Sequence, residues 1–191
     1  MVIETKLLRG ALVGLKSAFC KDVTRPTLQQ INVSADAGKC VLCVSDGYRI
    51  HRVTLAAAEV TAGSLQTADL TIALAIAKAA GLVDVILTPK PQTATFPSVD
   101  VDQVIPALYK GPACNTVWLS ARYLADAADA VEALRKAVGE DGGNLVVRCP
   151  PEPSSPIRID WASRCGRAAF LGVMRMYLNT GGPADALAVG Q

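Results

Sequence analysis

The 191-residue sequence is poor in several features that usually indicate a particular binding or catalytic function. Aromatic residues make up only 5% of the chain, which argues against a platform on which single-stranded bases stack. The net charge is only +2, so binding to a polyanion has to come from the distribution of charge and not from its total. No Gly-x-x-x-x-Gly-Lys loop for cradling phosphates occurs.

Groups suited to catalysis or metal binding are also scarce. His51 is the only histidine, and we expect it at the surface or rim of a strand, without a catalytic role. Cys40 and Cys43 have the spacing of half a zinc site, but the other half is missing, and residues three apart on a strand point to opposite faces. We therefore expect these cysteines to pack in the core, and we predict no catalytic residues, no metal site and no cofactor.

The six cysteines stand at irregular spacings and the first residues show no secretory signal, so we expect reduced thiols and a cytoplasmic protein. The most apolar segment, 70–87, carries Lys78 and Asp84 and is too short to span a bilayer. We therefore expect no membrane association.

The first predicted helix, over 5–21, has one apolar and one basic face. The apolar stripe follows helical spacing and comprises Leu7, Leu8, Ala11, Leu12, Leu15, Ala18 and Phe19. Lys6, Arg9 and Lys16 fall on the opposite side at 100° per residue. This basic face is either solvated surface or a face for a polyanion.

Three strands follow the helix, after a possible short strand at 2–4. They are predicted over 28–34, 40–45 and 48–55. Turn signals at 36–38 and at Asp46-Gly47 join them into hairpins.

The segment 58–113 reads as a connector. It contains a helix over 69–81 with almost no polar face, which we expect to be mostly buried, a strand over 84–88 and a run of prolines.

From residue 117 the earlier order repeats. The predicted elements are a strand over 117–119, a helix over 120–138, strands over 145–149, 157–161 and 168–176, and a loose tail over 179–191. Two copies of β-α-β-β-β predict an α+β fold in which each helix covers one face of a curved antiparallel sheet.

Four strings of residues stand in an order known from one family. They are KDVTRPTL at 21–28, SDGYRI at 45–50, FPSVDVDQVIP at 96–106 and FLGVMRMYL at 170–178. Together they resemble the bacterial replicative sliding clamp, the β subunit of DNA polymerase III, and still more the short clamp-like proteins of phages and mobile elements. The family's patterns are Thr-Arg-Pro after the first helix, Thr-Asp-Gly-His-Arg-Leu at a hairpin, Phe-Pro-Asp-Tyr-x-x-Val-Leu-Pro at a domain end and a terminal Met-Pro-Met-Arg-Leu.

The resemblance implies the DNA-clamp fold, in which a domain pairs two β-α-β-β-β halves with antiparallel sheets outside and helices inside. The implied organisation is a clamp-like domain over 1–178, with half-repeats 1–57 and 114–178, a connector over 58–113 and a flexible tail over 179–191. Alternatively, 1–106 is one shortened domain and the remainder is half of another. A family ring contains more domains than this chain supplies, so the chain would have to self-associate to encircle DNA.

In the family, the last three strings converge on a hydrophobic pocket that grips a short peptide of a polymerase or another replication protein. Carried over by motif, the pocket would be lined by Tyr48, Arg49, Ile50, Pro97, Val104, Met174, Met176 and Leu178. The alternative is that these side chains are ordinary core. Arg175 and Tyr177 stand where the family has proline and arginine, and a tail follows Leu178, so the pocket is either altered or covered.

The resemblance also implies contact with double-stranded DNA. Basic residues of the inner helices and the arginine of the Arg-Pro turn face the duplex in the family, and the matching residues here are Lys6, Arg9, Lys16, Arg25 and Arg122. Such binding is independent of sequence and sensitive to salt. The helix over 120–138 carries as many carboxylates as cations, which argues against strong binding by a monomer.

Two functions from different classes follow. The first is a non-catalytic, sliding-clamp-like processivity factor or accessory protein of DNA replication, with a peptide pocket for partners. The second is a structural or regulatory clamp-fold protein that binds neither DNA nor clamp-binding peptides. An enzyme that uses His51 or a cysteine is the least favoured reading.

Overall fold

A computed structural model of the chain describes residues 1–91, 120–142, 144–149 and 156–174. Its helices are α1 (Thr5–Lys16), the 3-10 turn η1 (Pro26–Gln29), α2 (Thr67–Ala80) and α3 (Ala121–Val138). Its strands are β1 (Val2–Glu4), β2 (Gln30–Asp36), β3 (Lys39–Ser45), β4 (Arg49–Ala56), β5 (Gly63–Gln66), β6 (Asp84–Ile86), β7 (Val146–Arg148), β8 (Ile157–Ala162) and β9 (Ala168–Met174).

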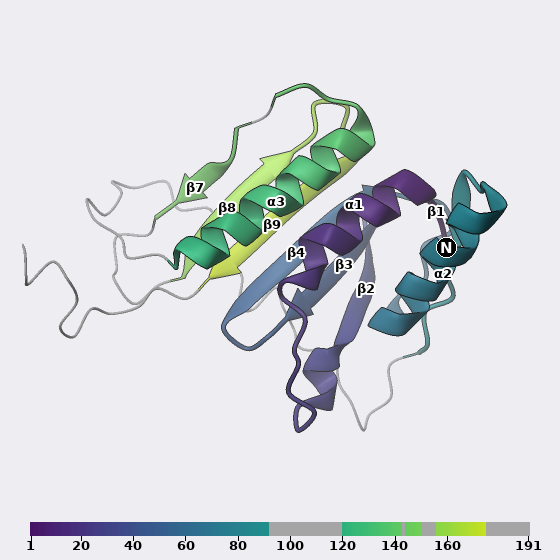
Figure 1. Cartoon of the computed structure of the whole chain (residues 1–191), viewed down its shortest axis with the longest axis horizontal. Coiled ribbons are helices and arrows are strands. Elements are labelled where there is room, and N and C mark those ends of the chain that lie inside the picture. Colours follow the sequence, from purple (N-terminus) through teal and green to yellow (C-terminus); the bar gives the residue numbers. More distant parts are fainter. Residues whose placement is uncertain (92–119, 143, 150–155, 175–191) are drawn as a thin grey trace, which may run out of the picture.

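Most strands belong to one antiparallel sheet with the order β5-β2-β3-β4-β9-β8-β7. The central ladder joins β4 to β9, so that Arg49 stands opposite Met174 and Leu55 stands opposite Ala168. Segments from the two ends of the described chain thus share a single sheet (Figure 1). β1 and β6 form a separate two-stranded sheet. The predicted α+β fold with antiparallel sheets is confirmed.

Helices α1 and α3 lie side by side and antiparallel on one face of the large sheet, with α1 against β4 and α3 against β9 (Figure 1). Small residues permit a close approach, since Gly10 and Gly14 of α1 face Ala133 and Ala130 of α3. Helix α2 lies beside α1, next to β5 and β6. One side of the molecule is therefore a layer of helices, while the opposite side of the sheet carries no helix among the described residues.

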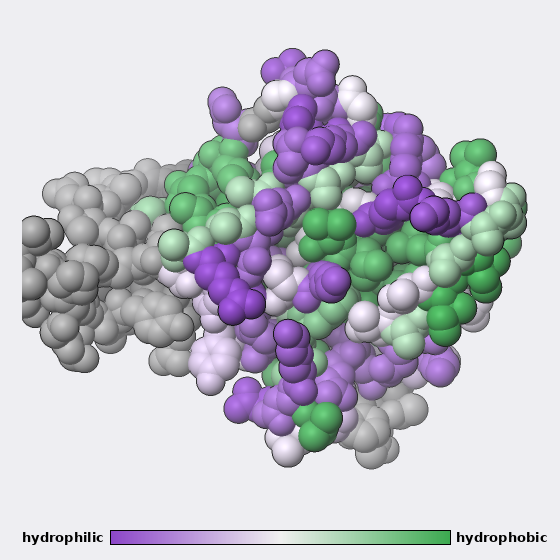
Figure 2. Space-filling view, in the orientation of Figure 1, coloured by the Kyte–Doolittle hydropathy of each residue, from purple (hydrophilic) through white to green (hydrophobic). Residues whose placement is uncertain are grey.

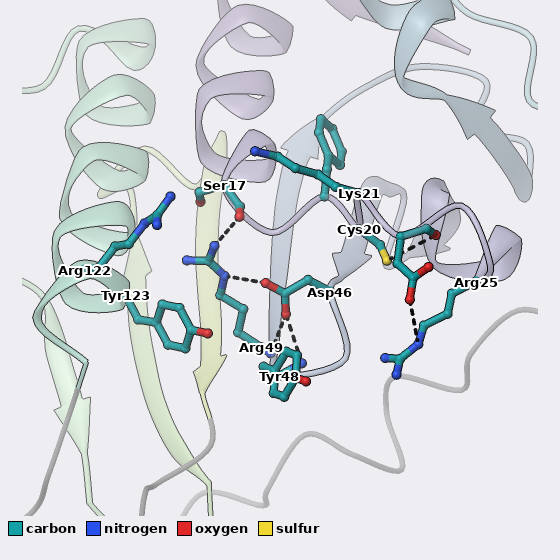
Figure 3. Close-up of a pocket in the computed structure, with 11 residues that line it drawn as sticks. Ser17, Cys20, Lys21, Arg25, Asp46, Tyr48, Arg49, Arg122 and Tyr123 are labelled. Atoms are coloured by element: carbon teal, nitrogen blue, oxygen red, sulfur yellow. Dashed lines mark hydrogen bonds and ion pairs between the residues drawn. The ribbon is translucent and has the colours of Figure 1, made fainter.

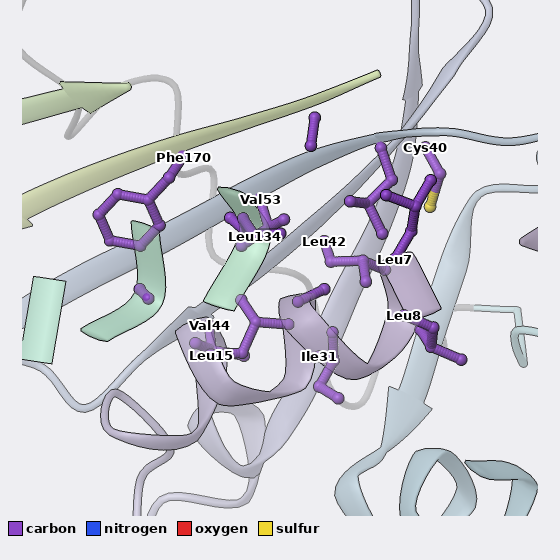
Figure 4. Packing of buried hydrophobic residues seen from close by; sticks show 14 of the residues in the cluster. Leu7, Leu8, Leu15, Ile31, Cys40, Leu42, Val44, Val53, Leu134 and Phe170 are labelled. Atoms are coloured by element: carbon purple, nitrogen blue, oxygen red, sulfur yellow. The ribbon is translucent and has the colours of Figure 1, made fainter. Parts of the chain in front are cut away.

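The main core lies between the helices and the sheet. Its largest buried side chains include Leu7, Leu8, Leu15, Ile31, Leu42, Leu55, Leu134, Ile157, Ile159 and Phe170, several of which are drawn in Figure 4. A smaller buried cluster of Cys43, Ile50 and Val173 stands apart from it. Cys40 belongs to the main core and Cys43 to the smaller cluster, which confirms that both thiols are buried and point to opposite faces of β3. Burial raises the pKa of the Cys40 thiol to about 12, so it stays protonated at neutral pH.

Helix α1 is shorter than predicted, because it ends at Lys16 and not at residue 21. The peptide N–H groups of Ala18 and Phe19 donate to the carbonyls of Leu15 and Lys16, which tightens the chain into a turn. The first residues of the predicted strand 28–34 belong instead to η1, which begins at Pro26. Proline suits this position because it lacks a peptide N–H that would need a partner.

The prediction that the helix over 69–81 is mostly buried is wrong. In α2 only Leu70, Leu74 and Ala77 are buried, while Ile72 and Ile76 are each 58% exposed. The sequence shows an apolar helix, but burial depends on how many neighbours cover it, and α2 lies at the side of the sheet where only one of its faces is covered. Several predicted features lie outside the described residues, namely the strand over 117–119, most of the proline run and the tail over 179–191. None of the described helices combines the length and apolar character required to cross a membrane.

Candidate functional site

The hairpin between β3 and β4 is built by short polar side chains. The Asp46 carboxylate accepts hydrogen bonds from the peptide N–H groups of Tyr48 (2.9 Å) and Arg49 (3.0 Å). The Ser45 hydroxyl accepts from the N–H of Gly47, which has a φ of +90° that favours glycine. The turn directs two neighbouring side chains in opposite directions: Tyr48 is 55% exposed, whereas Arg49 is only 7% exposed.

Arg49 joins three elements at one point. Its Nε donates to Asp46 in the hairpin (3.0 Å), Nη1 donates to Asp126 of α3, and Nη2 donates to the carbonyl oxygen of Ser17 at the end of α1. Its guanidinium also lies 4.3 Å from the centre of the Tyr123 ring. Burial by itself lowers the pKa of Arg49, but the hydrogen bonds to Asp126 and Asp46 outweigh burial, so the pKa rises and the group stays charged. This arginine therefore ties the hairpin to both core helices.

His51 lies two residues along β4, on the same side of the sheet. It is fully buried, which corrects the expectation of a surface or rim position: β4 runs beneath α1, so its helix-facing side chains are covered. The Gly14 carbonyl lies 2.6 Å from Nδ1, and because a carbonyl only accepts, the proton of the neutral ring sits on Nδ1. Nε2 is buried and has no hydrogen-bond partner among the residues that the structure describes, and the ring meets Phe170 edge-on. Burial lowers the pKa of His51, which favours the neutral ring.

A pocket with a volume of about 340 Å³ opens beside Arg49 (Figure 3). Its walls come from the end of α1, the loop before η1, the hairpin and the first turn of α3. The lining residues are Ser17, Phe19, Cys20, Lys21, Asp22, Arg25, Asp46, Tyr48, Arg49, Arg122 and Tyr123. Four cations, two carboxylates and three aromatic rings thus surround one hollow, which we call the hairpin pocket. It suits a ligand with an anionic group and a flat or apolar part.

A second hollow, with a volume of about 650 Å³, lies over α1 between α2 and α3. Its lining residues are Leu12, Val13, Lys16, Ser17, Phe19, Lys21, Thr67, Thr71, Arg122, Asp126 and Asp129. We call it the helix groove. It is the more apolar of the two, because Leu12 and Val13 line it and not the hairpin pocket.

The structure brings together part of the predicted peptide pocket. Tyr48 and Arg49 line the hairpin pocket, but Ile50 and Met174 do not. Strand alternation turns Ile50 to the other side of the sheet, into the cluster with Cys43 and Val173. Met174 stands opposite Arg49 in the ladder, yet its side chain is buried in the main core. Four further predicted residues lie outside the described chain: Pro97, Val104, Met176 and Leu178.

The residues predicted to contact DNA fall into two groups. Lys6, Arg9 and Lys16 are exposed along one side of α1, and with Val13 they form its whole exposed surface, which we call the basic face. Of the three cations, Lys6 pairs with Glu4 at 3.1 Å. Arg25 and Arg122 lie instead at the hairpin pocket.

Figure 2 shows the helix side of the molecule, where hydrophilic side chains alternate with apolar ones over α1 and α3, and an apolar area lies over α2. Most charges of α3 are paired: Glu132 pairs with Arg135 and Lys136 within the helix, and Asp126 pairs with Arg49 of β4. The hydrogen bonds from Arg135 and Lys136 lower the pKa of Glu132 to about 2. The basic face of α1 therefore supplies the clearest excess of positive charge on this side.

Several residues of the site were missed from the sequence, among them Lys21, Tyr123 and Asp126. Tyr123 and Asp126 are separated from the hairpin by long stretches of chain, and only the packing of α3 beside α1 brings them to Arg49, whereas Lys21 lines the pocket from the loop after α1. A signal was available for one of them, since Lys21 opens the string that includes the Arg-Pro turn.

Among the described residues there is no group of three side chains suited to hold a metal ion.

Comparison with solved structures identifies proteins with a similar fold. No protein-family model and no curated protein sequence matches the chain. Among solved structures, the DNA polymerase III β subunit of Thermotoga maritima superposes with a TM-score of 0.63 at 10% identity, covering 97% of this chain and 66% of that one. The β sliding clamp of C. crescentus gives 0.62 at 13% identity (93% and 65%), and a putative β subunit from Eubacterium rectale gives 0.62 at 10% identity (100% and 67%).

The chain spans about two thirds of the length of these clamps. At sequence identities this low, the structural superposition shows the fold alone. What this chain binds has to be argued from its own residues. The superposition of this chain on these clamps supports the resemblance that the four strings indicated. This chain has the α+β sliding-clamp fold and resembles the β subunits of bacterial DNA polymerase III.

Proposed function

We propose that the chain is a non-catalytic, sliding-clamp-like accessory protein of DNA replication that acts in the cytoplasm. It holds double-stranded DNA against the basic face of α1 without reading the base sequence, and it binds a replication partner at the hairpin pocket. The observation that carries the proposal is the basic face itself, displayed on the helix layer of a sliding-clamp fold.

The charge of α1 supports contact with a polyanion. The helix contains no aspartate or glutamate, and three of its four exposed side chains are cationic. On the opposite side of the sheet, carboxylates offset most of the positive charge, because Arg52 pairs with Asp36, and Arg148 and Arg158 share Asp160. Phosphates are therefore attracted more strongly to the basic face of α1 than to the outer face of the sheet.

The state of His51 supports a role without catalysis. A general base has to reach its substrate, but this side chain is fully buried between α1 and the sheet. Arg49 and the two carboxylates beside it are engaged in ion pairs that hold elements together. The site is therefore suited to binding.

A chain of this length resembles only part of a clamp, so encircling DNA requires several copies. Self-association is part of the proposal, and size-exclusion chromatography with light scattering measures it, with and without duplex DNA.

The DNA part is tested with a labelled duplex, by fluorescence anisotropy over a range of salt concentrations. One variant combines Lys6→Gln, Arg9→Gln and Lys16→Gln on the basic face. Its matched control combines Arg52→Gln, Arg148→Gln and Arg158→Gln on the outer face of the sheet. We expect the first variant to bind at least tenfold more weakly. The slope of the logarithm of the binding constant against the logarithm of the salt concentration should also become shallower, by the equivalent of about two to three phosphate contacts, because each contact releases counterions.

The control variant is expected to bind as the unchanged protein does. Equal weakening of both variants would mean that net charge alone attracts the duplex. If the unchanged protein does not bind duplex DNA in any oligomeric state, the alternative of a clamp-fold protein without DNA binding holds instead.

A further inference from the structure

Helix α2 presents an exposed face that consists of apolar side chains alone. The helix is buried on one side only, through Leu70, Leu74 and Ala77. Thr71 and Lys78 are exposed on the side of the helix groove, which Thr71 lines. The remaining exposed residues recur at helical spacing and are Ala68, Ile72, Ala75, Ile76, Ala79 and Ala80. We call this surface the α2 face.

The α2 face lies at the end of the helix layer. In Figure 1 the helices stand in the order α3, α1, α2, and in Figure 2 an apolar area lies over α2. Leu82, Val83 and Ile86, which follow α2 in the chain, are exposed as well, so apolar surface continues past the end of the helix. An exposed apolar surface of this kind marks a site of interaction with another protein or with a membrane.

A membrane is the less suitable of these two partners. Helices that lie in a membrane interface are rich in cations on the polar side and carry large apolar residues on the other. α2 contains one cation, Lys78, and no aromatic residue, and four of the six residues of the α2 face are alanines. Alanine offers little apolar area to lipid, but it lets another helix approach closely. The α2 face therefore suits a packed helix.

A second α2 in antiparallel orientation fits this face. Ala68, Ile72, Ala75 and Ala79 follow one another at intervals of four, three and four residues, which is the spacing of a seam between two packed helices. When Ile72 stands opposite Ala75 of the second copy, Ala68 stands opposite its Ala79. Each large side chain of the seam then meets a small one, so the face is complementary to itself.

The charges at the two ends of α2 favour the antiparallel orientation. Asp69 lies in the first turn of the helix and Lys78 lies in the last turn. An antiparallel pair brings the first turn of each copy beside the last turn of the other, so that opposite charges and opposite ends of the helix dipoles adjoin. A parallel pair would instead place like charges side by side.

We propose that the α2 face is a two-fold surface for self-association, on which α2 of a second copy of this chain packs antiparallel. Because both copies use the same residues, the contact closes at two chains. The inference goes beyond the proposed function, since it holds whether or not the chain binds DNA. Helix α2 has 14 residues and is about 21 Å long, so we expect a buried area near the lower end of the roughly 1,200–2,000 Å² of stable interfaces, and a micromolar dissociation constant.

Sedimentation velocity of the full chain over a range of concentrations measures the association. We expect a monomer in dilute solution and a dimer at high concentration. Ile72→Glu places a charge in the middle of the α2 face and should weaken the dimer at least tenfold. The matched control is Val23→Glu, which places the same charge at an 80% exposed apolar residue in the loop before η1, and it should associate as the unchanged protein does.

A mixture of two variants tests the antiparallel arrangement. Ile72→Glu and Ala75→Lys should each prevent the dimer when present alone, because each places an unpaired charge in the seam. An equimolar mixture of the two variants should form a dimer again, since the new carboxylate of one chain then stands opposite the new ammonium group of the other.

A monomer at every concentration, an unchanged dimer in the Ile72→Glu variant, or no dimer in the mixture overturns the proposal. A lower urea midpoint of Ile72→Glu in dilute solution also overturns it, because the chain itself would then cover the α2 face. So does binding of the unchanged protein, but not of Ile72→Glu, to vesicles of phosphatidylcholine and phosphatidylglycerol. Duplex binding in dilute solution is measured on the same variants and tests the proposed function separately.

Discussion

Gly10 of α1 lies directly against Ala133 of α3, so close that a Cβ atom on Gly10 would stand 3.0 Å from the Ala133 carbonyl oxygen. One turn further along, a Cβ on Gly14 would stand 3.2 Å from that of Ala130. The two glycines thus set the spacing of the helices that form the helix layer of the molecule, and the same packing brings Asp126 to Arg49.

Replacing Gly10 by leucine is expected to force the two helices apart. The obstructing atom belongs to the backbone of Ala133 and has no rotamer by which it could move aside, so we expect a loss of about 2 kcal/mol in the free energy of unfolding. Urea denaturation measures this. Val13→Leu on the exposed side of the same helix is the matched control and should leave the midpoint within about 0.5 kcal/mol. Equal stability of the two variants would show that the helices do not pack through Gly10.

Arg49→Met should destabilise the fold by about 2 kcal/mol. The change removes the guanidinium donor from Asp126, from the Ser17 carbonyl and from Asp46, which keeps its two peptide N–H donors. Both carboxylates remain partly exposed, so the loss stays below that of a fully buried pair. Arg52→Met on the opposite face of β4 removes a solvent-exposed ion pair to Asp36 and should cost less than about 0.5 kcal/mol. Thermal unfolding of the two variants compares them, and similar losses would contradict the role given to Arg49.

Stability should fall as the pH drops below about 6.5, the ordinary pKa of histidine. Burial lowers the pKa of His51 in the folded chain, so between that lowered value and 6.5 the unfolded chain binds a proton that the folded chain does not. One such proton lowers the free energy of unfolding by up to about 1.4 kcal/mol per pH unit, whereas above 6.5 the effect vanishes. Urea midpoints at pH 7.5, ~6.5 and ~5.5 reveal the slope. A His51→Gln variant should lose it, and an unchanged slope in that variant would assign the effect to other groups.

The exposed apolar side of α2 gives a comparison within one helix. Leu70 is fully buried, so Leu70→Ala should cost about 2–4 kcal/mol, while Ile72→Ala should cost less than about 1 kcal/mol. Chemical denaturation of the two variants in dilute solution measures both losses. A large loss for Ile72→Ala would show that this side of α2 is covered in solution.

The sequence was most informative where local rules decide the outcome. The helical spacing of Leu8 and Leu15 and the turn chemistry of Asp46 and Gly47 predicted α1 and the β3–β4 hairpin, and strand alternation placed Cys40 and Cys43 on opposite faces. Each of these depends on residues a few positions apart.

Contacts between distant segments could not be read in the same way. The burial of His51 depends on α1 crossing over β4, and the ion pair from Arg49 to Asp126 depends on α3 running antiparallel to α1. Glycine lowers helix propensity by about 1 kcal/mol relative to alanine, so local rules give no reason for Gly10 and Gly14 within α1. Only the position of α3 shows that they are sites of close approach.

Photo-cross-linking to duplex DNA tests the central claim most directly. A photoreactive amino acid is placed at Val13, on the exposed side of α1, or at Thr54, on the outer face of β4. If the helix layer holds the duplex, Val13 cross-links to it and Thr54 does not. Cross-linking from Thr54 alone, or from both positions to the same extent, would contradict the account.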